Sequence, residues 1–464
     1  MAFYNPFYKR TSRTRTAWDY TFELTDDHLT PETMSPLKYS YDTLGEAAYI
    51  RLTELAAAAK TTAAKTASPP TPTDLYTLLE AHHTSDPILS ALWDQASTVP
   101  AWVDWDQLAR GQPLLYRYGG AILTGLAYNS LLGGLGAERI VETLARTGGF
   151  SQRVVRRRLY ETTQHILQVT RSLEGIKPGG EGWVATLRVR LLHAAVRARI
   201  RALAKARQGY YDEEVNGVPI NDLDSLATIA SFSATLIWVA LPRQGIFIRR
   251  QEAEDYVALW RWIAWVIGCP DTRHFATPEG ARMFLESMLL YEVHPSPTSR
   301  VLADNLLNSL AGAPPAHVSR GMLVASARWL NGGDLCDALG LEKASLYYKA
   351  LMAGQCVFYV VMSYPTWVVP GLDERKCRWM RDVFWNMIVV SKSGLGGRVT
   401  GFEFKYVPEE DTVERQGREV KEKETTELEL RNLKWLGVGV VVLVLIGWVW
   451  YRMFVKAMEM VGLW

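Results

Sequence analysis

The chain has few cysteines and almost no excess charge of either sign. Its 464 residues include only Cys269, Cys336, Cys356 and Cys377, and no Cys-x-x-Cys pair. A zinc cluster or a disulfide framework is therefore not expected, which is typical of a reducing compartment. With 51 Lys and Arg against 49 Asp and Glu, the net charge of +2 gives no indication of nucleic-acid binding. The first residues lack an apolar core, so no signal peptide is expected.

Motifs of several enzyme classes are absent as well. No His-Glu-x-x-His pattern occurs, and Glu161 and His165 are four residues apart without a second copy, which excludes the paired Glu-x-x-His motifs of di-iron bundles. The glycine-rich Gly133–Gly136 lacks the Lys-Ser/Thr of a phosphate-binding loop. We find no alternation typical of strands and no internal repeat. The short basic run Arg153–Arg158 is interleaved with apolar residues, as on the solvated face of a helix.

What the chain does have is a helical period over most of its length. From about residue 75 to 395, apolar residues recur every three to four positions between Gly, Pro and Asn breaks. This pattern predicts an all-α protein with a single large helical domain. We divide the chain into an N-terminal arm, helix and low-complexity loop (1–74), the helical domain (75–400), a charged, exposed stalk (401–434), a transmembrane helix (435–452) and a short tail (453–464).

The run Trp435–Tyr451 has the length and flanks of a membrane anchor. Its 17 residues carry no charge and extend about 25 Å as a helix. The basic residues before it are Arg415, Arg418, Lys421, Lys423, Arg431 and Lys434, and those after it are Arg452 and Lys456. The positive-inside rule therefore predicts a cytosolic domain and a tail across the membrane, a tail-anchored topology. A buried core helix is the alternative, which the charge-dense segment 409–434 disfavours.

A second uncharged run covers residues 350–370. It contains Gln355, Ser363 and a Tyr-Pro pair at 364–365, which predict a buried helix that ends near Tyr364. A second span is an alternative. So is a face that dips into the membrane and carries Trp367, Val368 and Val369.

One histidine lies within an apolar helical stripe. Val189, His193, Val196 and Ile200 recur at i, i+4, i+7 and i+11, which is one face of a helix. An unpaired buried polar group costs about 1–3 kcal/mol, so His193 is expected to have a hydrogen-bond partner or a metal. From the residues alone, a satisfied core histidine is the more frequent arrangement.

Several segments spread over about residues 85–330 resemble a known family in their order and spacing. They are 99–105 (VPAWVDW), 110–112 (RGQ), 142–150 (ETLARTGGF), 158–162 (RLYET), 188–197 (RVRLLHAAVR), 216–221 (NGVPIN), 259–263 (LWRWI) and 267–270 (IGCP). Together they resemble the MpaB / rubber-oxygenase (latex clearing protein) catalytic domain, closest to the fungal ER-bound type. Members of that family are helical, hold a b-type haem and cleave isoprenoid C=C bonds with O2.

The resemblance implies a haem site. His193 matches the histidine that binds iron in the family, and Arg158, Arg190 and Arg197 are expected to contact the cofactor, since guanidinium groups match carboxylates such as haem propionates. Cys269 offers a thiolate as an alternative ligand. A helix that ends at Gly268 explains the Cys-Pro pair more simply.

The resemblance also implies a catalytic face. Arg158 and Thr162 are four residues apart, so they share one side of a helix with Glu161 nearby. We expect this face on the distal side of the haem, with Arg158, Glu161 and Thr162 as catalytic residues. The alternative is a surface Arg–Glu pair of little consequence. The family carries a lysine between this Arg and Thr, and Glu161 departs from that pattern, which puts a lysine-ligated resting state in doubt.

The function that follows is a haem-dependent oxygenase. It is expected to act with O2 on a lipophilic, prenylated secondary-metabolite intermediate at the endoplasmic-reticulum membrane, by oxidative C=C cleavage or oxygenation. The catalytic domain is expected in the cytosol. The alternatives are an oxidoreductase of the same fold that hydroxylates or rearranges a non-isoprenoid scaffold, and a non-catalytic membrane-associated helical protein.

Overall fold

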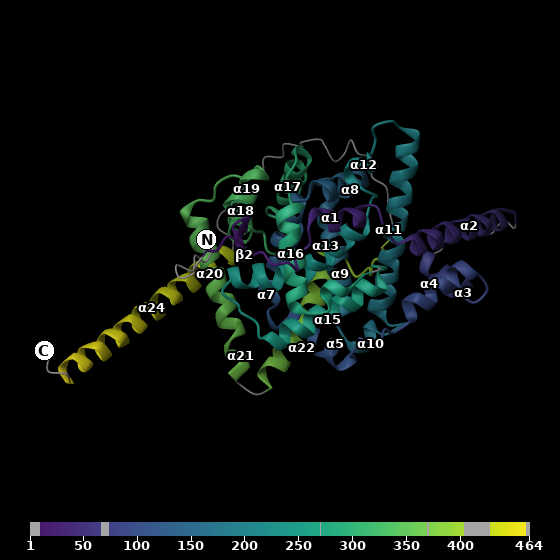
Figure 1. Ribbon diagram of the computed structural model, residues 1–464. Coiled ribbons are helices and arrows are strands. Elements are labelled where there is room, and N and C mark those ends of the chain that lie inside the picture. Colours follow the sequence, from purple (N-terminus) through teal and green to yellow (C-terminus); the bar gives the residue numbers. More distant parts are fainter. Residues whose placement is uncertain (1–9, 66–73, 270, 369–370, 403–426, 461–464) are drawn as a thin grey trace.

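A computed structural model describes residues 10–65, 74–269, 271–368, 371–402 and 427–460. Over these ranges the chain forms helices packed around one main apolar core, with smaller clusters beside it (Figure 1). The prediction of an all-α fold is confirmed. The short helical segments are α1 (Pro31–Met34), η1 (Ser35–Lys38), α12 (Glu213–Asn216), η4 (Leu236–Ala240), α14 (Leu241–Arg243), η5 (Arg273–Phe275), α19 (Gly333–Ala338), α21 (Pro365–Val368) and η6 (Asn386–Val390).

The N-terminal arm contains a β-hairpin that the sequence pattern did not predict. Strand β1 (Thr14–Ala17) pairs antiparallel with β2 (Tyr20–Glu23), and the turn residues Trp18 and Asp19 have φ of 53° and 60°. Positive φ at both positions is the geometry of a type I′ turn. Trp18 Nε1 donates a hydrogen bond to the Leu289 carbonyl (3.2 Å), which holds the hairpin on helix α16 (Pro278–Tyr291). The expectation of no strands is therefore wrong for this short segment.

The arm continues into helix α2 (Thr43–Lys65), which is the helix expected within residues 1–74, before the low-complexity loop. Residues 66–73 of that loop lie outside the described residues. Helices α3 (Leu75–His82) and α4 (Pro87–Ser97) follow. The carboxylates of Asp74 and Asp86 accept hydrogen bonds from the first free N–H groups of these two helices and so fix where they begin.

The helical pattern over residues 108–131 forms several pieces rather than one helix. They are α5 (Trp105–Gly111), α6 (Leu114–Arg117), α7 (Gly119–Gly125) and the π-helical η2 (Leu126–Leu132), followed by the 3-10 turn η3 (Gly133–Gly136). Pro113 has no N–H to donate, so the first break falls there. The π-helical segment η2 places several side chains, among them Leu126 and Ser130, on the wall of the central cavity described below.

Two long helices form the centre of the molecule. Helix α9 (Val155–Thr170) and helix α11 (Glu181–Ala206) are separated by the short α10 (Leu173–Ile176) and the predicted break at residues 177–180. A Cβ atom on Gly182 would lie 2.7 Å from the Gln168 carbonyl oxygen, so a glycine is required where the helices meet. Helix α8 (Glu138–Thr147) lies before α9.

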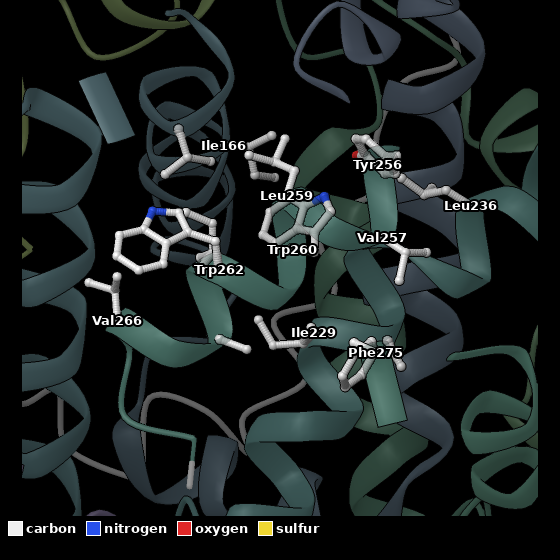
Figure 2. Packing of buried hydrophobic residues seen from close by; sticks show 14 of the residues in the cluster. Ile166, Ile229, Leu236, Tyr256, Val257, Leu259, Trp260, Trp262, Val266 and Phe275 are labelled. Carbon is white, nitrogen blue, oxygen red and sulfur yellow. The ribbon is translucent and has the colours of Figure 1, made fainter. Parts of the chain in front are cut away.

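Tryptophans fill the main core. Helices α13 (Asp222–Phe232) and α15 (Arg250–Val266) contribute to it, and Figure 2 shows Trp260 and Trp262 of α15 among aliphatic side chains. The indole N–H of Trp262 donates to the Ile176 carbonyl (2.9 Å), and that of Trp183 donates to the Ala96 carbonyl (3.1 Å). Such bonds let large rings be fully buried without an unpaired donor.

The C-terminal half adds α17 (Pro297–Leu310), α18 (Arg320–Asn331), α20 (Leu346–Ser363), α22 (Leu372–Trp385) and α24 (Glu427–Met460). As predicted, α20 ends next to Tyr364, but it buries one face rather than its whole surface. Helix α24 projects away from the body (Figure 1).

The end of the predicted stalk is not an exposed linker. Residues 403–426 lie outside the described residues. Phe402 before them is buried, and residues 427–434 form the first part of α24. There Glu429 and Asn432 are buried, and Asn432 Nδ2 donates to Gln355 Oε1 of α20 (3.1 Å). The prediction of an exposed stalk is therefore wrong for residues 427–434, because paired polar side chains hold the first turns of α24 against the body.

Two stretches of the described residues are long and apolar enough to cross a membrane. The first, Asp222–Arg243, is 56% buried in the core. The second, Glu427–Lys456, has a mean hydropathy of 2.1, and none of its most apolar part is buried. The second therefore agrees with the predicted anchor.

Candidate active site

A cavity of about 560 Å³ lies between α8, α9, α11, α13 and η2. Its walls are mostly aliphatic and aromatic, because each of these helices turns its apolar stripe inward. The volume falls within the range of about 300–1,000 Å³ that small-molecule and cofactor sites occupy. Polar side chains interrupt these walls, and the ionisable ones and those without a partner among the described residues are the candidates for binding or chemistry.

His193 is one of these polar groups. Val189, His193 and Val196 of α11 all line the cavity, as the predicted stripe requires, and Ile200 packs in a small cluster further along the helix. Among the described residues, the His193 imidazole has no hydrogen-bond partner. Burial, followed by the Arg197 guanidinium, lowers the pKa of His193 to about 4. The ring is therefore neutral at physiological pH, which is the form that binds a metal ion.

A second histidine, His165 of α9, lies near His193. Thr186 Oγ1 donates its proton to the Gly182 carbonyl (2.7 Å), so its contact with His165 Nε2 (2.9 Å) has the imidazole as donor. Burial, and then the nearby His193, lower the pKa of His165 to about 4. His165 is thus a neutral, hydrogen-bonded ring on the cavity wall, whereas His193 has both nitrogens available.

The predicted catalytic face also reaches the cavity. Arg158, Glu161 and Thr162 of α9 all line it. The Glu161 carboxylate is buried and paired twice, to Arg158 Nη1 (2.9 Å) and to Arg157 Nε (3.1 Å). Its negative charge is therefore balanced and held in place. The Thr162 hydroxyl has no protein partner in the described part of the chain and remains able to donate.

Arg190 and Arg197 lie elsewhere. Both are 2% exposed and belong to α11, but neither lines the cavity. Arg190 makes a two-pronged ion pair with Asp42 (both 2.7 Å), and Arg197 donates to the Pro219 and Ile220 carbonyls (3.2 and 2.9 Å). Their donors hold the arm and the loop before α13 against α11. Because these donors are already used, neither arginine is included in the proposed cofactor site.

The cysteine alternative also loses support. Cys269 is buried and does not line the cavity, and burial raises the pKa of its thiol. Gly268, at φ 95°, ends α15 in the left-handed conformation that the simpler interpretation expects.

The sequence did not single out Asp224 as a residue of the cavity. Asp224 of α13 is buried on its wall, beside Arg139 of α8 (3.3 Å), which is itself paired with Glu292 (2.7 Å). Among the described residues, Asp224 Oδ1 has no hydrogen-bond partner. Burial raises the pKa of Asp224 to about 6, although Arg139 partly offsets this. In the sequence, the acidic residues after Asn221 indicate only the start of a helix, so no signal marked Asp224.

Fold and site together define a helical protein whose large apolar cavity presents a neutral histidine and an Arg–Glu–Thr face. The family described as ER-bound oxygenase mpaB/B'/Rubber oxygenase, catalytic domain, matches residues 116–355. Rubber oxygenase from Streptomyces sp. (strain K30) is 25% identical over 263 residues, which cover 55% of this chain. A solved structure of latex clearing protein LCP in the closed state has a TM-score of 0.54 at 18% identity and covers 74% of this chain and 90% of that one.

Because the match extends over half of the chain, this protein belongs to the MpaB and rubber-oxygenase catalytic-domain family. The resemblance given by the sequence segments is confirmed. The aligned region spans 61% of the Streptomyces rubber oxygenase.

Proposed function

We propose that this protein is a membrane-bound, haem-dependent oxygenase that uses O2 to cleave or oxygenate a C=C bond of a lipophilic, prenyl-bearing substrate. The observation that carries the proposal is His193, a neutral imidazole on the wall of a large apolar cavity with no hydrogen-bond partner among the described residues. Family membership supports the oxygenase class. The apolar walls are suited to a substrate that partitions into lipid.

The residues of the cavity fit a haem group. His193 would hold the iron of such a group, and Arg158 would supply positive charge for one of its carboxylates or for O2. A bound haem would supply the iron at which O2 is activated. Arg190 and Arg197 are not part of this set, because their donors are used elsewhere.

The other residues of the cavity orient the reacting groups and shape their surroundings. The Thr162 hydroxyl is free to donate a hydrogen bond into the cavity. Glu161 holds Arg158 in place through their ion pair. The aliphatic walls lower the local dielectric constant, which strengthens these polar contacts.

For the cellular site we propose the endoplasmic-reticulum membrane, with the body in the cytosol and α24 as the anchor. The exposed apolar surface of that helix supports the anchor, and the excess of basic residues before it supports the orientation.

Haem binding tests the proposal directly. His193→Ala should lose most bound haem, because it removes the ligand, whereas His165→Ala and His274→Ala should keep it. The absorption spectrum of the purified full-length protein, with its shift on reduction and CO addition, measures this. Full haem retention in His193→Ala would refute the ligand assignment. Absence of any haem band in the unmodified protein would favour the non-catalytic alternative.

A further inference from the structure

Helix α20 runs beside α24 in the same direction. Gln355 of α20 pairs with Asn432 of α24 (3.1 Å), and further along both helices Val357 faces Gly439, where a Cβ atom would lie 3.2 Å from the valine. The rings of Phe358 and Trp435 are 5.7 Å apart. In Figure 1, α20 runs downward to α21, whereas α24 extends beyond this contact toward the lower left.

This pairing fixes how deep the end of α20 lies relative to the anchor. Trp435 is the first residue of the uncharged run in α24, and it contacts Phe358. From Phe358 to Ser363, α20 advances by about 8 Å. It then continues into α21. The end of α20 and α21 therefore lie level with the first turns of the segment that would enter the bilayer.

The surface at this end has the composition of a membrane-contacting tip. Of the residues that the structure describes here, 364–368, 371 and 372 are all uncharged in the sequence. Phe247, Met362 and Leu372 are 60%, 43% and 40% exposed. Phe247 N–H donates to Tyr364 Oη (2.9 Å), so the Phe247 segment is joined to this end.

Charged residues of both signs follow, beginning with Asp373, which pairs with Arg117, and the exposed Glu374. Arg375 and Arg378 of α22 are exposed, and Lys376 Nζ donates to the Met362 carbonyl (2.7 Å). Apolar residues at a tip with cations behind them are the arrangement that inserts into the headgroup region and attracts anionic lipids.

We infer that the end of α20, α21 and the start of α22 form a second membrane contact, which inserts into the leaflet that α24 enters. The occupant of this apolar surface is lipid, because the adjacent anchor holds it at the depth of the bilayer. The inference rests on the proposed anchoring by α24. It adds that the body is seated on the membrane rather than tethered at a distance from it.

Nitroxide accessibility tests the inference in the full-length protein, reconstituted in vesicles of phosphatidylcholine and phosphatidylserine. A Cys356→Ser background leaves three buried cysteines, so single labels can be placed by Met362→Cys and Leu372→Cys. Leu346→Cys is the matched control, because it is exposed at the opposite end of α20. Val444→Cys reports on the anchor itself.

The labels at 362 and 372 should collide with O2 several-fold more, relative to a water-soluble nickel complex, than the label at 346. Equal, water-like ratios at 346, 362 and 372 with a lipid-like ratio at 444 would overturn the tip and leave the anchor intact. A water-like ratio at 444 as well would overturn both. Protection of 362 and 372 from both reagents would show a protein occupant and overturn the lipid assignment.

Discussion

At the scale of single residues, His193 and His165 show how burial prepares a site. Both rings are held neutral, but only His165 has a hydrogen-bond partner in the described structure. Metal-binding histidines usually donate their second N–H to a partner that fixes the ring. The His193 ring is instead positioned by packing, within the stripe it forms with Val189 and Val196.

Thr162 and Thr163 offer a matched pair of substitutions. Both line the cavity, but Thr163 Oγ1 already donates to the Leu159 carbonyl (2.8 Å), whereas the Thr162 hydroxyl is free to donate into the cavity. Thr162→Val should keep the haem spectrum and lower turnover by about 10²-fold, the usual effect of removing one preorganised donor. Thr163→Val should retain turnover. Equal turnover of the two variants in a product assay would show that Thr162 has no part in the chemistry.

Asp224 should give the stability of the protein a measurable pH dependence. Its folded pKa of about 6 lies above the unfolded value of 3.8, so the folded state binds the proton more tightly. This contribution to stability is complete below pH 3.8 and is lost as pH rises through 6, by about 3 kcal/mol at most. Asp224→Asn removes the loss. Urea denaturation should therefore show the variant gaining stability relative to the unmodified protein between pH 4 and 7. A constant difference over that range would contradict the raised pKa.

Some site residues could be predicted from the sequence alone and others could not. The stripe around His193 and the shared face of Arg158 and Thr162 follow from helical spacing, and both line the cavity. Arg190 could not be assigned in this way, because its partner Asp42 is 148 residues away in the sequence. A guanidinium pairs equally well with a protein carboxylate and with a cofactor, so only the tertiary structure distinguishes the two.

At the scale of elements, the helices were predictable and the irregular pieces were not. Periodicity identified α4, whose buried residues Leu89, Leu92 and Ala96 lie on one face, and the amphipathic first half of α9. The β1–β2 hairpin was missed because its turn is Trp18-Asp19, whereas the turn signal in sequences is Asn-Gly or Asp-Gly. Its position depends on α16, more than 260 residues away, which local sequence does not encode.

The contact between α9 and α11 depends on a single glycine. An added methyl group at Gly182 would meet the backbone of Gln168 and Val169, at 2.7 Å from the carbonyl oxygen and 3.0 Å from Cα, and these atoms have no side-chain freedom to yield. Gly182→Ala should cost about 1–3 kcal/mol, the range for overpacking, and lower the Tm.

Gly134→Ala is the control for this prediction, because nothing lies within 4 Å of its added Cβ. Calorimetry or circular dichroism should show its Tm unchanged or slightly raised. Because Gly182 also accepts the Thr186 hydrogen bond that fixes His165, Gly182→Ala should disturb the cavity as well. An unchanged Tm for Gly182→Ala would show that the helices separate without cost.

At the scale of the whole molecule, the apolar helix α24 and the apolar cavity are linked through helix α20. A lipophilic substrate concentrates in the bilayer, so an enzyme that acts on it gains by being held there. The hydroxyl of Tyr359 in α20 hydrogen-bonds Thr124 of α7 (2.9 Å). The η2 segment, which follows α7 directly, lines the cavity. The helix that packs on the anchor is thus also in contact with the wall of the site.

The orientation of the molecule across the membrane gives the last prediction. Six basic residues precede the uncharged run and two follow it, and moving the larger group across a bilayer is disfavoured. The sequence contains no Asn-x-Ser/Thr acceptor, so glycosylation reports only on an added tag. A tag after Trp464 should be glycosylated in microsomes, whereas a tag before Met1 should not, and protease added outside should digest the body. Glycosylation of the N-terminal tag with protection of the body would reverse the topology and place the cavity in the lumen.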